Sequence, residues 1–232
     1  KKNSLPIYRA DGIMATVTGL TRPSANSKTG DMLQLSILAD EGLDPVQTIA
    51  VGADIGICGG CGFRSKESGG NGACYVLTHQ MPLAVYRATV DVPTSTPTLP
   101  DKPIRLGAYG DPAKVPTSLL KETTNGRRWT GYTHAWADET VDNAYSDYLM
   151  ASVETKEQQR AAVAQGYRTF RVMPVGDDSL VDGEIRCVNE THGTTCADCG
   201  LCNGNGSKGA ANIAVMAHGS GKGAIEGDKV KV

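Results

Sequence analysis

The sequence has little net charge and no long hydrophobic segment. Its formal net charge is −2, so no overall positive field attracts nucleic acid, and such contact would need a local patch such as Arg127-Arg128. The longest apolar runs, such as Ile213 to Ala217, are far shorter than the roughly 20 residues that span a bilayer. We expect no signal peptide, because the first residues lack the pattern of one. We therefore expect a soluble, cytoplasmic protein with no membrane partner.

Histidine is also scarce, and the cysteines do not pair evenly. The chain has four histidines, which argues against a zinc-dependent hydrolase, because open catalytic zinc sites favour histidine and carboxylate ligands. It has seven cysteines in 232 residues. An odd number leaves one thiol unpaired in any complete disulfide scheme, and the chain is longer than a typical disulfide-stapled module. Metal ligation is therefore the better interpretation.

Strands and helices alternate in the second half of the chain, which predicts an α/β fold. A helix over Thr155 to Gln165 has the strongest signal, because Thr155 and Gln158 form a capping box and Gly166 follows. Repeated strand, helix, strand units imply a parallel sheet or a partial (β/α) barrel. The other elements expected here are strands at Ile104 to Tyr109, Trp129 to His134, Leu149 to Val153, Tyr167 to Val175 and Asn212 to Ala217, and a helix at Pro112 to Thr123.

The first part of the chain is expected to be rich in strands. Ile13 to Thr18, Met32 to Leu38 and Val46 to Val51 have strand-like patterns. Four prolines between Val92 and Pro103 exclude regular structure there. We therefore predict a β-rich part at 1–92, a connector at 93–103 and a β/α part at 104–232, together forming one compact unit.

The first group of cysteines is Cys58, Cys61 and Cys74, in a glycine-rich segment. Such glycines suit a loop that wraps closely around an inorganic centre, although they equally mark a flexible loop. A metal centre held by only three thiols needs a fourth ligand from elsewhere, such as His79, or keeps an open coordination position. Catalytic metal centres bind their substrates at such open positions.

The second group is Cys187, Cys196, Cys199 and Cys202. Two successive two-residue gaps allow three thiolates to converge from one tight loop, as in ferredoxin-type sequences, and Cys187 would be the fourth ligand. The spacing favours an iron–sulfur cluster, with zinc as the alternative. One or two [4Fe-4S] clusters would account for all seven thiols.

Several motifs resemble a family of cysteine-rich phage and plasmid proteins that is distantly similar to radical SAM enzymes. They are Asn26 to Gly30, the first cysteine group with Tyr75, Gly110-Asp-Pro112, Tyr132 to His134 with Trp136, the Cys196 to Cys202 run, and Ala217-His218-Gly219. The resemblance implies that three cysteines hold a [4Fe-4S] cluster whose fourth iron binds S-adenosylmethionine (SAM). It also implies a partial barrel and a second, four-cysteine cluster. The gaps of two and twelve residues here depart from that class, where they are three and two.

Polar residues near predicted strand ends are candidates for catalysis. Asp111 lies between a predicted strand and Pro112, and Glu154 precedes the Thr155 cap. His134 occupies every second position with Tyr132 and Trp136, so that the three would point to one face of a strand. Asp111, Glu154 and His134 each have a simpler interpretation, respectively a helix cap, a solvated carboxylate and a core histidine. The candidate cofactor-binding residues are Lys28, Tyr132, Arg171 and His218.

Together, the cysteine spacing and the resemblance predict an iron–sulfur, radical SAM-like enzyme. The resemblance also implies a phage or mobile-element context, and hence action in the host cytoplasm. The enzyme's substrate would be a small molecule or a macromolecule of unknown identity. The alternative is a non-catalytic module, stabilised by iron–sulfur or zinc, that recognises nucleic acid or a host protein.

Overall fold

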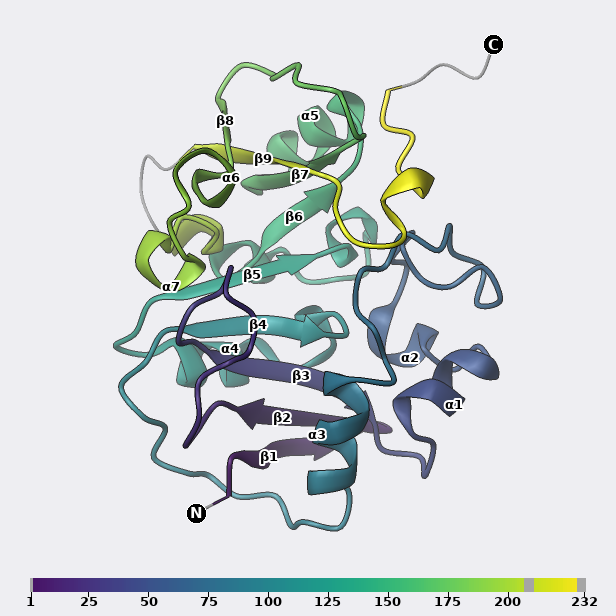
Figure 1. The fold of residues 1–232 in the computed structure, drawn as a ribbon, viewed down its shortest axis with the longest axis vertical. Helices are drawn as coiled ribbons and strands as arrows, with labels where there is room; N and C mark the ends of the chain where they lie inside the picture. The colour runs from purple at the N-terminus through teal and green to yellow at the C-terminus, as the bar shows by residue number, and fades with distance from the viewer. Residues whose placement is uncertain (1, 207–210, 229–232) are drawn as a thin grey trace.

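The protein is described from a computed structural model that covers residues 2–206 and 211–228. A nine-stranded sheet runs through the whole molecule in the order β1-β2-β3-β4-β5-β6-β7-β9-β8 (Figure 1). The first three strands are antiparallel, and every pairing from β3 onwards is parallel. The strands are β1 (Ser4–Ala10), β2 (Ile13–Thr18), β3 (Leu33–Ala39), β4 (Ile104–Tyr109), β5 (Trp129–Thr133), β6 (Met150–Val153), β7 (Thr169–Met173), β8 (Glu184–Arg186) and β9 (Asn212–Met216).

This architecture confirms the α/β class and the mostly parallel sheet. The connector at 93–103 contains no helix or strand, and β3 pairs with β4 directly across it. The sheet is therefore continuous between the two parts of the chain.

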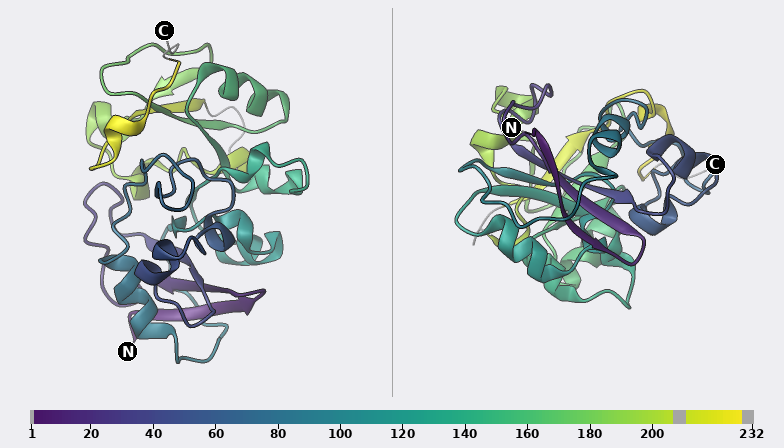
Figure 2. Two further views of the ribbon diagram at one scale, coloured as in Figure 1. Left: turned by 90° about the vertical axis from the view of Figure 1, so that its right-hand side faces the viewer. Right: turned by 90° about the horizontal axis from the view of Figure 1, so that it is seen from below.

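Helices cover the two faces of the sheet differently. α4 (Thr117–Thr124) and α5 (Lys156–Ala164) lie on one face, and α3 (Met81–Thr89) lies on the other (Figure 2). The short helices α1 (Pro45–Ala50) and α2 (Ile55–Cys58) lie beyond the carboxyl ends of the parallel strands, whereas α6 (Val188–His192) and α7 (Cys196–Cys199) lie towards their amino ends (Figure 1).

Local signals explain both helices that were predicted and one of those that were not, α1. α5 begins at the expected Thr155 cap, with both hydrogen bonds of the capping box present. The predicted strand at Val46 to Val51 is wrong, because Asp44 and Gln47 form a capping box and Pro45 occupies the first turn, which starts α1 there. The predicted helix from Pro112 is interrupted at Pro116, so that a 3₁₀ turn (Pro112–Lys114) precedes α4.

The largest core lies between β2, β3 and β4 and includes apolar residues from α3 and α4. Met14, Leu35, Ile37 and Leu106 are fully buried in it. A smaller cluster packs β6 against α5. Among the residues that the structure describes, no helix has the length and apolar character needed to cross a bilayer.

Candidate functional site between the two cysteine groups

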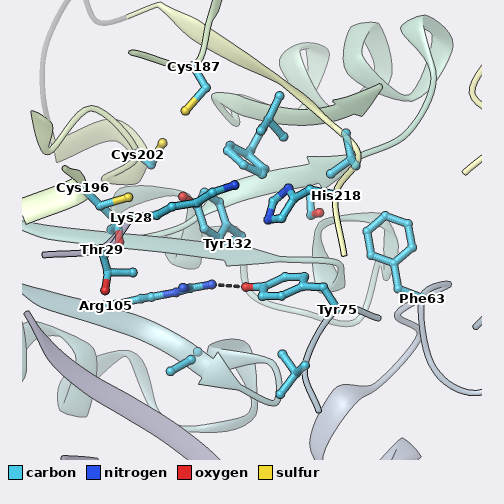
Figure 3. A pocket seen from close by; sticks show the side chains of 18 of the residues that line it. Lys28, Thr29, Phe63, Tyr75, Arg105, Tyr132, Cys187, Cys196, Cys202 and His218 are labelled. Atoms are coloured by element: carbon cyan, nitrogen blue, oxygen red, sulfur yellow. Dashed lines mark hydrogen bonds between the residues drawn. The ribbon is translucent and has the colours of Figure 1, made fainter. Parts of the chain in front are cut away.

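One cavity of about 260 Å³ lies over the face of the sheet opposite α4 and α5. Both cysteine groups line it, six of the seven thiol-bearing residues being half-buried or buried and only Cys74 exposed. Side chains of β4, β5, β7 and β9 form its floor, and Figure 3 shows Tyr132, Arg105 and Tyr75 pointing into it. The fold thus brings together two groups that are far apart in sequence.

The first cysteine group lies at the carboxyl ends of the strands. Cys58 ends α2, and the backbone of Asp111 donates to the carbonyl of Ile57 at 2.8 Å, which joins this segment to the end of β4. Gly110 allows β4 to end close to β3 and to this segment. Its φ is +73°, and a β-carbon there would lie 2.7 Å from the side chain of Ile37. Cys74 returns to the group through a hydrogen bond from its N–H to the Phe63 carbonyl at 2.8 Å.

The second cysteine group lies near the amino ends of the same strands. The backbone of Cys187 donates to Ala214 of β9 at 2.8 Å, and Cys202 accepts from Gly131 of β5 at 2.9 Å. Arg168 donates to the Leu201 carbonyl at 2.8 Å. This loop is consequently attached to β5, to β9 and to Arg168, the residue that precedes β7.

The thiols of each group influence one another electrostatically. Burial raises the pKa of Cys58, and repulsion from Cys61 and Cys74 adds to that rise. Burial also raises the pKa of Cys202 to about 12, with further contributions from Cys187, Cys196 and Cys199. Buried, closely spaced thiols lose their protons only when a nearby positive charge stabilises the thiolates. A bound metal supplies such a charge and takes the place of the thiol protons. Within residues 2–206 and 211–228, no three His, Cys, Asp or Glu side chains are close enough to hold one metal ion.

Asp111 has a defined structural role at the cavity wall. Its Oδ1 accepts from the Ala113 N–H at 2.9 Å, capping the 3₁₀ turn. Its Oδ2 accepts from the Thr133 hydroxyl at 3.0 Å and from the His134 N–H at 2.9 Å. Asp111 therefore ties the end of β4 to the end of β5 and positions His134.

His134 and Glu154 lie beside the first cysteine group. His134 Nε2 is 3.9 Å from the Cys61 sulfur, and burial lowers the pKa of His134. Burial raises the pKa of Glu154, whose charge in turn contributes to the raised pKa of Cys61. His79, suggested as a borrowed ligand, is exposed and lies outside the cavity lining. The histidine nearest this group in the described structure is thus His134.

Three of the four candidate cofactor-binding residues line the cavity, namely Lys28, Tyr132 and His218. Tyr132 lowers the pKa of Cys202 and so opposes part of the rise caused by burial, and its ring lies 4.1 Å from that of Phe170, measured between centroids. His218 lies against Tyr75, with 5.4 Å between ring centroids. These residues add aromatic surfaces to both sides of the cavity.

The structure places Arg171 elsewhere. Its side chain is fully buried in an ion pair with Glu184, at 2.7 Å from Nη2 to Oε2, and it also donates to the Ser179 carbonyl. Trp136 is absent from the cavity too, because β5 ends at Thr133 and a 3₁₀ turn breaks the predicted alternation. The indole packs in the cluster between β6 and α5 instead and donates to Ser152 at 2.8 Å.

Arg105 is a site residue that sequence reasoning missed, and Tyr75 was named only as part of a motif, without a role. Arg105 is the second residue of β4 and Tyr75 follows Cys74, and the guanidinium donates to the tyrosine oxygen (Figure 3). The sequence did contain a signal for Arg105. In a strand, Arg105, Gly107 and Tyr109 lie on the same face because they are two residues apart. A charged residue at such a position indicates a face that meets a cavity or a partner.

The chain gives no match to protein-family models, to curated protein sequences or to solved structures.

Proposed function

We propose that this protein is an iron–sulfur enzyme of radical SAM-like type. Cys58, Cys61 and Cys74 would hold the catalytic cluster, and the second cysteine group would hold another. The observation that supports this most is that both groups line one cavity over a parallel sheet, with a place for substrate between them. A partial-barrel geometry, with metal-binding loops at opposite ends of the strands, belongs to the same proposal.

The chain's own residues have distinct roles in this proposal. Cys58, Cys61 and Cys74 would hold the cluster, which when bound would supply one-electron reducing chemistry towards SAM. His134 and Glu154 are the candidates for proton transfer, since both lie beside Cys61. Asp111 positions His134 through its backbone N–H. The apolar floor around Phe170 and Val172 would exclude water from the substrate.

Metal and sulfide analysis of protein purified without oxygen tests the proposal first. We expect a brown protein that contains iron and inorganic sulfide. SAM added to the reduced protein should change its electron paramagnetic resonance signal and yield 5′-deoxyadenosine, and Cys61→Ser should abolish both effects. A colourless protein that stays folded with stoichiometric zinc, or an unchanged spectrum with no 5′-deoxyadenosine, would rule out this function.

One contact favours a second candidate, a non-catalytic module stabilised by metal. Because His134 Nε2 is 3.9 Å from the Cys61 sulfur, a small movement would make it a fourth ligand and close the first site. The module would then recognise nucleic acid or a host protein. In that case His134→Ala should release metal from the first group, whereas the open-site proposal expects metal to remain.

A further inference from the structure

The charged residues around the cavity are predominantly basic. Lys28, Arg105 and Lys222 line it, against Asp111 and Glu190. Both acids already have partners: Asp111 accepts three hydrogen bonds, and Glu190 pairs with Arg186 at 3.3 Å and accepts from Met216. Within the described residues, none of the three basic side chains forms an ion pair with a carboxylate. Because Glu190 is paired with Arg186, these three cations face only the carboxylate of Asp111, and positive charge exceeds negative charge in this set of side chains.

Lys28 is held in place beside the second cysteine group. The Cys196 N–H donates to the Lys28 carbonyl and the Ala197 N–H to the Thr29 carbonyl, each at 2.9 Å. The two segments approach closely at Gly30, where a β-carbon would lie 2.9 Å from the Thr195 hydroxyl oxygen. From this fixed backbone the Lys28 side chain extends into the cavity (Figure 3).

Arg105 is oriented from the other side. Its guanidinium donates to the hydroxyl of Tyr75, the residue next to Cys74, and lies 5.9 Å from the centroid of the tyrosine ring. Nε of Arg105 is buried without a hydrogen-bond partner. An unsatisfied donor on a fixed guanidinium favours a ligand with acceptor oxygens, which guanidinium groups bind with two parallel hydrogen bonds.

We propose that the cavity binds a small organic anion, whose carboxylate or phosphate group lies between Lys28 and Arg105. The proposal rests on the proposed function and gives the substrate of that site a chemical class. The cavity volume suits a small molecule, and the aromatic pairs Tyr75–His218 and Tyr132–Phe170 offer flat surfaces to its body.

The same cations could instead balance the charge of the second cysteine group. Burial raises the pKa of Cys196, and the charges of Arg105 and Lys28 oppose that rise. If the cations bind a ligand anion, removing one weakens anion binding. If they balance the charge of the cysteine group, removing one lowers the metal content, so both quantities must be measured.

Binding of malonate and of pyrophosphate to the anaerobically purified protein tests the proposal by calorimetric titration. We expect one of them to bind, malonate indicating a carboxylate ligand and pyrophosphate a phosphate ligand. Lys28→Met and Arg105→Gln should each weaken that binding at least tenfold while iron and sulfide content stay at the wild-type level. Arg87→Gln, at an exposed arginine of α3, is the matched control and should bind as the wild type does.

Three results would overturn the anion site: neither probe binds, both variants bind as tightly as the wild type, or the variants lose iron and sulfide. The titration needs no SAM cleavage. Failure to form 5′-deoxyadenosine with anion binding intact would therefore remove the enzyme proposal alone, and loss of binding with cleavage intact would remove this one.

Discussion

At the scale of single residues, Asp111 is the clearest case of a carboxylate whose role is structural. Asp111→Asn should lower the free energy of unfolding by about 1–3 kcal/mol, because the amide must point one NH₂ group at a buried donor. Chemical denaturation of both proteins measures the difference. Asp142→Asn is the control, since Asp142 is an exposed cap with one acceptor bond and asparagine caps equally well. An Asp111→Asn protein of unchanged stability but without SAM cleavage would show that Asp111 acts on the substrate.

A second residue-scale prediction concerns the buried pair of Arg171 and Glu184. Glu184→Gln should cost about 3–5 kcal/mol, because it leaves the buried guanidinium without its counter-charge. The exposed pair of Asp31 and Lys102 is the comparison, and Asp31→Asn should cost less than about 1 kcal/mol. Equal effects of the two substitutions on urea denaturation would contradict the structural assignment of Arg171 and reopen a ligand-binding role for it.

At the scale of elements, the two cysteine loops differ in how firmly they join the sheet. The second loop is hydrogen bonded to β5 and β9, so a metal there should stabilise the fold. We expect Cys199→Ser to lower soluble yield and to cost at least about 3 kcal/mol, or roughly 6–12 °C in melting temperature for a chain of this size. Differential scanning fluorimetry of anaerobic samples measures this shift.

Cys61→Ser is the matched variant in the first loop. Many hydrogen bonds of this loop are local turns, such as Arg64 to Cys61 and Gly69 to Lys66. The variant should therefore stay folded, with part of its iron and none of its activity. If Cys61→Ser unfolds the chain and Cys199→Ser does not, the catalytic and structural roles are reversed. If both behave alike, all seven thiols belong to one cooperative unit.

At the scale of the whole molecule, the continuous sheet predicts a single cooperative unfolding transition. Because β3 pairs with β4 across the connector, amides of Ile13–Thr18 and Met150–Val153 should open with the same free energy in native-state hydrogen exchange. Earlier opening of the first segment as denaturant is added would instead indicate that residues 1–92 are a separate domain.

How much of this molecule could be predicted from its sequence depends on how local each signal is. The helix after Thr155 was predictable because its capping box lies within four residues, whereas the apolar run at Val46 to Val51 hid an equally local signal at Asp44 and Gln47. The division of the cysteines into two groups followed from spacing alone. The order of the strands in the sheet brings both groups to one cavity. This order depends on contacts between distant segments, so short sequence patterns do not reveal it.

The candidate site shows the same limit. Lys28, Tyr132 and His218 could be named from motifs, yet Arg105 acquires its place only through Tyr75, from a different segment. Arg171 was misplaced because its partner, Glu184, lies on the edge strand β8, which sequence patterns did not reveal. A local pattern can mark such a residue as unusual, as the strand periodicity does for Arg105, but its role is defined only by the distant partner.

The backbone contact between Lys28 and Cys196 also determines when the cavity can exist during synthesis. Lys28 and Thr29 leave the ribosome well before Cys196 and Ala197, to which they bond, because the two segments are far apart in the sequence. Until then the cavity lacks the wall that contains the second cysteine group, while the first group can already meet β3. Under the proposed function, the first cysteine group would thus be ready to take up its cluster before the wall that contains the second group is in place.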